Sequence, residues 1–509
     1  MRNKISHQII FIILISVLFK PLWIFDNYNL GSFGEDDYSY WLHASTIAFD
    51  NDIDYLNDYY YDDKNFVDGK NTPYHPPGAG YLSSIFVKIF SLFDDKSKTD
   101  EIRINPIGSY AYLGYFFSNV LITLIALILL KKILIEKGVY RPIYIILTFL
   151  STLVHFVSTR FLMSHSTEFF LVCAILYLFF CVEKFQKYHI SLLFLTYFVL
   201  LFSRPSTFLY TILLLFIFRK KFLTISSRFS FNLTCVGLFF VFYLLLSNYL
   251  YGSYTLLFNP DINKTSQSFF ENLEFSEFGF RILKIPNLFF SANMGIFFST
   301  PVVFTAIFGL PRLLKLFENK LEKILLVIYL IAPFIILVVW GGQEVSYGQR
   351  LLVGILPICC IATSLFWNNL KRPSLLFPIA FNTYLGYLFF YSNKFLTLSK
   401  GINLWGSPSN FTAENYYINL YLSFNNLEYI VSGLTKNLYF VGFLKYINLE
   451  NLKLLLIKLS ISDEMVLSTI GLKTRYEEFE NFYFFTYSVL VLAFSISTVY
   501  FLKAPKTID

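Results

Sequence analysis

Long apolar runs, separated by short polar or basic stretches, dominate this chain. A helix needs about 20 apolar residues to cross a bilayer, and fewer where neighbouring helices shield one end. The pattern predicts an all-α polytopic membrane protein with a bundle of about 12 transmembrane helices. The runs lie near residues 9–27, 105–130, 142–159, 166–182, 189–203, 205–218, 231–250, 288–310, 322–340, 351–369, 374–391 and 482–502.

Basic residues between these runs predict the orientation of the bundle. If the amino terminus is cytoplasmic, alternation of the loops places every basic cluster on the cytoplasmic side, as the positive-inside rule requires. Both termini are then cytoplasmic. The first run follows Arg2 and Lys4 and leads into no small-residue cleavage site, so we interpret it as a retained signal anchor. The clusters are Lys131, Lys132, Lys137 and Arg141; Lys184 and Lys187; Arg219, Lys220, Lys221 and Arg228; Arg312, Lys315, Lys320 and Lys323; Lys371 and Arg372; Lys503 and Lys506.

This topology divides the chain into three parts. Residues 1–391 form the predicted transmembrane catalytic domain, and its first outer loop, 28–104, contains an interfacial helix at about 76–93. Residues 392–481 mix aromatic patches with Asn-rich stretches and form a predicted extracytoplasmic region. Residues 482–509 form the last transmembrane helix and a cytoplasmic tail.

The composition agrees with a membrane location and argues against a soluble protein, a nucleic-acid-binding protein and a disulfide or zinc protein. Of the 509 residues, 55% are hydrophobic and only 15% are charged, which is too apolar for the surface of a soluble protein. The net charge of +7 comes from the loop clusters, so we expect no nucleic-acid partner. The five cysteines lie within apolar runs and lack the spacing of disulfide or zinc sites, so we interpret them as packing residues.

The candidate chemistry begins directly after the first apolar run, in the acidic sequence Glu35-Asp36-Asp37. This position is at the membrane surface, where a lipid-linked substrate presents its head group. A carboxylate there could act as a general base, and a second carboxylate could hold a metal or shape the pocket. The alternative is an ordinary solvated cluster, because acids accumulate where lysine and arginine are excluded. We assign no cofactor, and a divalent cation stays open.

Two stretches of the first outer loop resemble that of the GT-C superfamily of membrane glycosyltransferases, namely GEDDYSYWLHASTIAFDNDIDYLNDYY and NTPYHPPGAGYLSS. The likeness is greatest to prokaryotic relatives of the protein O-mannosyltransferases and lipid A aminoarabinose transferases. Later stretches resemble other signatures of the superfamily in the same order, and together they span most of residues 31–360. They are FLMSHSTEFFLVCAILYLFF, LLFSRPSTFLY, YLYGSYTLLFNP, LFFSANMGIFFSTPVVFTAIFGL and WGGQEVSYGQRLLVGILPI.

The resemblance implies a GT-C-type bundle with an extracytoplasmic catalytic loop. It implies Asp36 as catalytic base, with Asp37 as its neighbour or as the base itself, and it aligns Tyr40 with an aromatic of the family. His165 and Glu168 correspond to a second functional polar group at the outer end of two helices. A capped helix start explains these two residues equally well.

Arg204 and Arg350 are both expected at the outer surface, where a guanidinium can hold a phosphate through two hydrogen bonds. The alternative for Arg350 is an interfacial anchor, and Arg204 beside Pro205 could simply snorkel. His75 in Tyr74-His75-Pro76-Pro77 either approaches the donor phosphate or a metal, or makes local hydrogen bonds.

The function expected from these features is transfer of a sugar from a polyprenyl-phosphate donor to a protein, lipid or glycan outside the cytoplasm, with inversion at the anomeric carbon. The expected location is a prokaryotic cytoplasmic membrane, with membrane lipids as further partners. A flippase or transporter would line a path through the bundle with polar residues, whereas here they gather on one face. A polysaccharide polymerase or ligase would place its key residues in a late loop. The sequence names neither the sugar nor the acceptor.

Overall fold

A computed structural model describes part of the chain, and all regular secondary structure in that part is helical. The runs at 9–27 and 482–502, most of 374–391 and the whole region 392–481 lie outside the described residues, so the division into three parts stays a prediction. The described residues are 35–55, 72–73, 75–107, 109–158, 160–183, 185–220, 229–252, 254, 296–339, 349–369, 376, 379–380 and 383.

Helices lie over each predicted apolar run between residues 105 and 369. In chain order they are α5 (Tyr110–Glu136), α6 (Pro142–Thr148), the π-helical η4 (Phe149–Leu153), α7 (Val154–Ser158), α8 (His165–Cys181), α9 (Lys187–Ser203), α10 (Pro205–Ile217), α12 (Phe229–Tyr251), α16 (Ile296–Ser299), α17 (Pro301–Leu314), α18 (Lys320–Val339), the 3₁₀-helical η6 (Arg350–Ile355) and α19 (Leu356–Asn369).

Some of these runs contain interruptions that the apolar pattern does not reveal. In the run at 142–159, Ser151 leaves the helical region with ψ −166°, and its hydroxyl donates to the Leu147 carbonyl at 2.7 Å. Such side-chain bonds to the preceding turn compete with the regular helical pattern. In the run at 288–310, Thr300 precedes Pro301 and separates α16 from α17, because proline disfavours helical backbone in the residue before it.

The first turn of α5 is capped twice. The Ser109 hydroxyl accepts a hydrogen bond from the Tyr112 N–H at 3.1 Å, and the Asp94 carboxylate accepts from the N–H groups of Tyr110 and Ala111 at 2.7 and 2.8 Å. These groups have no partner within the helix, and a carboxylate there also suits the helix dipole. The caps fix the outer segment onto the long helix of the bundle.

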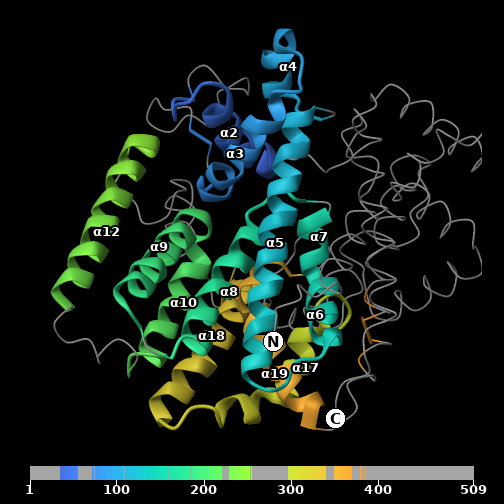
Figure 1. The fold of residues 1–509 in the computed structure, drawn as a ribbon, viewed down its shortest axis with the longest axis vertical. Helices are drawn as coiled ribbons and strands as arrows, with labels where there is room; N and C mark the ends of the chain where they lie inside the picture. The colour runs from blue at the N-terminus through green and yellow to red at the C-terminus, as the bar shows by residue number, and fades with distance from the viewer. Residues whose placement is uncertain are drawn as a thin grey trace, which may run out of the picture.

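The segment that the topology predicts to lie outside contains α2 (Glu35–Phe49), α3 (Gly78–Ser91), the short η3 (Lys96–Lys98) and α4 (Thr99–Ile104), which gather at one end of α5 (Figure 1). α3 packs between α2 and α5, and its bounds lie within the range 76–93 given for the predicted interfacial helix. The close approach of α3 to α2 depends on Gly80, because a Cβ there would lie 2.5 Å from the His43 Cβ. Ile85, Ile89 and Leu92 are exposed, and the interfacial location of this helix stays a prediction.

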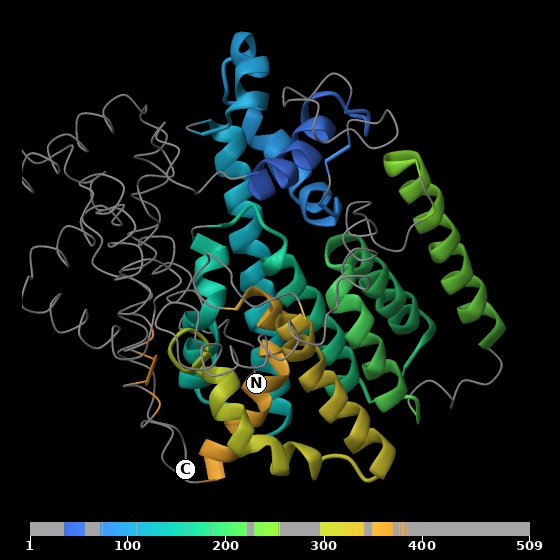
Figure 2. The ribbon, with the colours of Figure 1, turned by 180° about the vertical axis from the view of Figure 1, so that it is seen from behind.

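The rest of the bundle is held together by contacts between helices that are not consecutive in the chain. α5 packs against α8, α17 against α19, and α10 against α18, while η6 contacts both α8 and α18. α12 packs along α9 at the side of the bundle, as both views show (Figures 1 and 2). The contact of η6 with α8 brings Arg350 towards the end of the bundle that carries the other predicted site residues.

The outward faces of several helices are apolar. On α18, Ile324, Ile328, Ile331 and Ile335 follow helical spacing and are each about half exposed, and similar side chains are exposed on α9, α10, α12 and α17. Two described helices, Tyr110–Glu136 and Arg350–Asn368, are long and apolar enough to cross a membrane. These features indicate a membrane protein, whereas the count of twelve spans and the orientation stay predictions.

Candidate functional site

The acids after the first apolar run form the first turn of α2, where the positive end of the helix dipole favours negative charge. Asp36 and Tyr40 are one helical turn apart and share a face. Asp37 lies about 100° further around the helix axis. Asp37 therefore faces different neighbours from Asp36 and Tyr40.

Asp36 lies between an imidazole and a guanidinium. Its Oδ1 is 3.2 Å from His75 Nε2 and its Oδ2 is 3.3 Å from Arg350 Nη1. The Asp36 side chain is 31% exposed, so the carboxylate is open to molecules that arrive from outside. Residues from α2, from the turn before α3 and from η6 thus meet at one point.

Asp37 is in a different environment, although it is the adjacent residue. Its side chain is 0% exposed, and its Oδ2 accepts a charge-assisted hydrogen bond from Arg160 Nη2 at 2.8 Å. Arg160 lies in the turn between α7 and α8. The pair therefore joins the start of α2 to that turn and leaves Asp36 as the accessible carboxylate of the two.

Tyr40 connects the accessible part of the cluster to a buried part. Its hydroxyl is 3.1 Å from the Ser164 Oγ, and its ring centroid is 4.8 Å from that of His75. Burial raises the pKa of Tyr40, and the positive charge of Arg204 opposes this rise. The residue is therefore a neutral phenol that can donate or accept a hydrogen bond.

The buried part of the cluster is centred on Glu168 in the first turn of α8. Its Oε2 is 3.0 Å from His165 Nδ1 and 3.4 Å from Arg204 Nε, and its Oε1 accepts from the Thr207 hydroxyl. The backbone N–H of Gly354 also bonds to this carboxylate. A Cβ on Gly354 would lie 2.8 Å from Glu168 Oε1, so only glycine allows η6 to approach so closely.

The structure therefore brings together all the residues that the sequence analysis selected. Both arginines predicted to bind a phosphate are paired with carboxylates of the chain itself, and neither role is tested by these contacts. His165 and Glu168 are fully buried, so an incoming ligand would meet Asp36 before it could meet them. The selected residues are Asp36, Asp37, Tyr40, His75, His165, Glu168, Arg204 and Arg350.

Other members of the cluster were missed. Arg160 had a usable signal, because the predicted topology places it in an outer turn, where the positive-inside rule disfavours arginine. The sequence contains no comparable indication for Thr207, Gly354 and Ser164, because they join the cluster only through contacts with segments distant in the sequence. Within the part of the chain that the structure describes, no group of three or more His, Cys, Asp or Glu residues could hold a metal ion. A divalent cation stays an open prediction.

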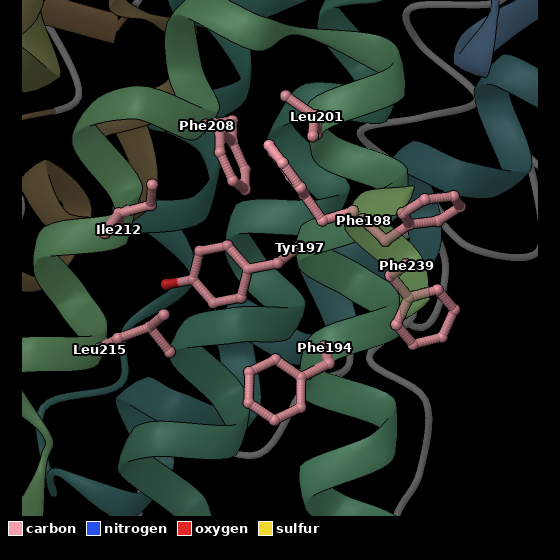
Figure 3. Close-up of a pocket in the computed structure, with 9 residues that line it drawn as sticks. Phe194, Tyr197, Phe198, Leu201, Phe208, Ile212, Leu215 and Phe239 are labelled. Carbon is pink, nitrogen blue, oxygen red and sulfur yellow. The ribbon is translucent and has the colours of Figure 1, made fainter. Parts of the chain in front are cut away.

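A separate cavity of about 200 Å³ lies between α9, α10 and α12, and its lining is apolar or aromatic (Figure 3). Tyr197 is the lining residue with a hydroxyl, and that hydroxyl donates to the Thr211 carbonyl at 2.8 Å. The lining includes none of the acids or arginines described above, so this cavity offers no group for the proposed chemistry. It is lined by Phe194, Tyr197, Phe198, Leu201, Phe208, Ile212, Leu215, Phe239 and Phe240.

Comparisons with known proteins add little. No protein-family model matches the chain, and no curated protein does. Among solved structures, the chain is similar to the oligosaccharyltransferase of Archaeoglobus fulgidus in its apo form, with 13% sequence identity and a TM-score of 0.44. The alignment covers 88% of this chain but only 59% of that one. A TM-score of this size does not establish a common fold, so membership of the GT-C superfamily stays a prediction from the sequence motifs.

Proposed function

We propose that this chain is a membrane glycosyltransferase that moves a sugar from a polyprenyl-phosphate donor to an acceptor hydroxyl on the extracytoplasmic side. One observation carries the proposal: the partly exposed carboxylate of Asp36 lies between His75 and Arg350 at one end of an apolar bundle. Transfer from a phosphate carrier needs a base for the acceptor and a cation for the leaving phosphate. Asp36 and Arg350 are suitable groups, and they are adjacent.

In the proposed reaction, the acceptor oxygen attacks the anomeric carbon and loses its proton to Asp36. The bond between that carbon and the phosphate oxygen breaks, and the polyprenyl phosphate leaves with the bonding electrons. A single displacement of this kind inverts the anomeric configuration. When the donor binds, the Arg350 guanidinium gives up its contact with Asp36 and binds the donor phosphate, because its planar group can bind two phosphate oxygens. This exchange frees the Oδ2 of Asp36 as the donor binds.

Asp37 and Glu168 have supporting roles in this proposal. Both carboxylates are fully buried and paired with arginines, Arg160 and Arg204 respectively. A general base must come within hydrogen-bonding distance of the proton that it removes, and buried groups of this kind cannot reach an acceptor in the described arrangement. We therefore assign the base to Asp36 and not to Asp37.

The test is sugar transfer by purified protein from a radiolabelled polyprenyl-phosphate sugar. We expect Asp36→Asn to lower the rate by about 10²–10⁴-fold, the usual contribution of a general base. Asp100→Asn is the matched control, because Asp100 is an exposed acid of the same outer segment on α4, and it should keep the wild-type rate. Equal losses in both variants would mean that the acids act through their summed charge. Movement of intact donor across proteoliposomes without cleavage would instead identify a flippase.

A further inference from the structure

The backbone of His75 is fixed from several sides. Its N–H donates to the Ser39 hydroxyl at 3.1 Å, and its carbonyl accepts from His43 Nε2 at 2.7 Å and from the Tyr251 hydroxyl at 3.1 Å. Because Pro76 follows, the backbone of His75 is also restricted to extended conformations. The imidazole that contacts Asp36 is therefore held through its own main chain by groups on α2 and α12.

The contact with the His75 carbonyl fixes the position of one proton on the His43 ring. A carbonyl oxygen has no proton, so the contact with the His75 carbonyl requires a proton on His43 Nε2. Burial lowers the pKa of His43 to about 3, which keeps the ring neutral at ordinary pH. A neutral ring with its proton on Nε2 has none on Nδ1. Nδ1 is therefore an acceptor.

The neighbouring tyrosines supply the matching donors. The Tyr55 hydroxyl is 2.6 Å from His43 Nδ1 and must donate to it, and Tyr81 lies 3.2 Å from the Tyr55 oxygen and can donate there in turn. The hydrogen bonds thus run in one direction, from Tyr81 through Tyr55 and His43 to the carbonyl of His75. Gly80 allows His43 to sit against α3, since any Cβ there would clash with it.

We propose that His43 is a positioning residue, held by Tyr55 as the Nε2–H tautomer, which fixes the His75 carbonyl and so keeps the His75 imidazole against Asp36. This inference rests on the proposed function only in taking Asp36 as the reacting carboxylate. A histidine that merely fills the core would need neither this tautomer nor this donor position. The two roles therefore differ in what His43 variants tolerate.

Two amide variants separate these roles. In His43→Gln the amide nitrogen can reach the position of Nε2 and still donate to the His75 carbonyl, whereas the shorter amide of His43→Asn reaches only the position of Nδ1. We expect the glutamine variant to keep kcat within roughly threefold and the asparagine variant to lose up to about 100-fold, because small misplacements at a reacting group are costly. KM for the donor should be unchanged in both variants, since Arg350 is untouched. Equal kcat in the two variants, or losses confined to thermal stability, would overturn the proposal.

A second measurement needs no transfer activity, so it separates this inference from the proposed function. In ¹⁵N-histidine NMR, the resonances lost in His43→Gln should report a neutral Nε2–H ring that does not titrate between about pH 5 and 8. The His75 resonances should shift in His43→Asn and stay in place in His43→Gln. A titrating ring, or an Nδ1–H tautomer, would overturn the positioning role even if the wild-type protein transfers sugar. Absence of transfer with the expected NMR result would overturn the proposed function alone.

Discussion

The same substitution at two adjacent residues should affect different properties, the transfer rate in one case and the stability in the other. Asp36→Asn and Asp37→Asn each replace a carboxylate with a neutral amide of almost the same size in the first turn of α2. We assign the chemistry to Asp36 and structural support to Asp37. We therefore expect the first variant to lose rate and keep stability, and the second to lose stability.

The burial of each carboxylate sets the size of these effects. Asp37 is 0% exposed and pairs with Arg160, which is 19% exposed. Removing one partner of a buried pair costs about 3–5 kcal/mol, and because Arg160 reaches solvent we take the lower end, about 3 kcal/mol. At about 2 °C per kcal/mol, the melting temperature should fall by about 6 °C. The contacts of the partly exposed Asp36 are longer, so their loss should cost about 1 kcal/mol or less.

The assay combines thermal unfolding of the purified proteins with initial transfer rates measured below all melting temperatures. The double variant Asp37→Asn with Arg160→Gln serves as a control, because removing both charges should recover part of the lost stability. An Asp37→Asn protein that melts like wild type but transfers sugar about 10²-fold more slowly would refute the reasoning, since it would make Asp37 the base.

Other predictions concern separate parts of the cluster. Arg350→Lys should keep partial activity, whereas Arg350→Ala should weaken donor binding and turnover, measured by titration with a polyprenyl-phosphate sugar, because the leaving phosphate gains charge in the transition state. Gly354→Ala should lower the melting temperature, since its methyl group would lie against Glu168 Oε1; an unchanged temperature would contradict the close approach of η6. The contribution of His43 to the free energy of unfolding should fall by about 2 kcal/mol between about pH 7 and 5, because His43 in the unfolded chain binds a proton near the ordinary histidine pKa of about 6.5, while the folded residue, with a pKa of about 3, does not. Denaturant titrations should show a shallower dependence on pH in His43→Gln.

The length of the apolar runs was sufficient to predict where helices lie, because a long apolar run in a membrane protein has few alternatives to a helix. The helices from α5 to α19 follow those runs. Interruptions at Ser151 and Thr300 were missed, since they depend on a side-chain hydrogen bond and on the residue that follows. A short interruption of a helix hardly changes the mean hydropathy of the apolar run that contains it.

The gathering of the candidate residues also followed from the sequence, because the predicted topology puts their segments at the same end of the bundle. Which of these side chains pair with each other could not be predicted from the sequence. Whether Asp36 or Asp37 faces outward depends on how α2 is rotated against Arg160, and whether Arg204 meets a ligand or Glu168 depends on how α8 packs near α10. Sequence spacing within one helix does not determine such contacts between helices.

The central claim is that Asp36 and Arg350 form a site for a lipid-linked sugar phosphate. An electron cryomicroscopy map of the protein with a bound, non-transferable polyprenyl-phosphate sugar analogue tests it most directly. We expect density for the phosphate at the Arg350 guanidinium and for the sugar beside the Asp36 carboxylate, with the Arg350–Asp36 contact broken. Density for the phosphate elsewhere, with that contact intact, would contradict it.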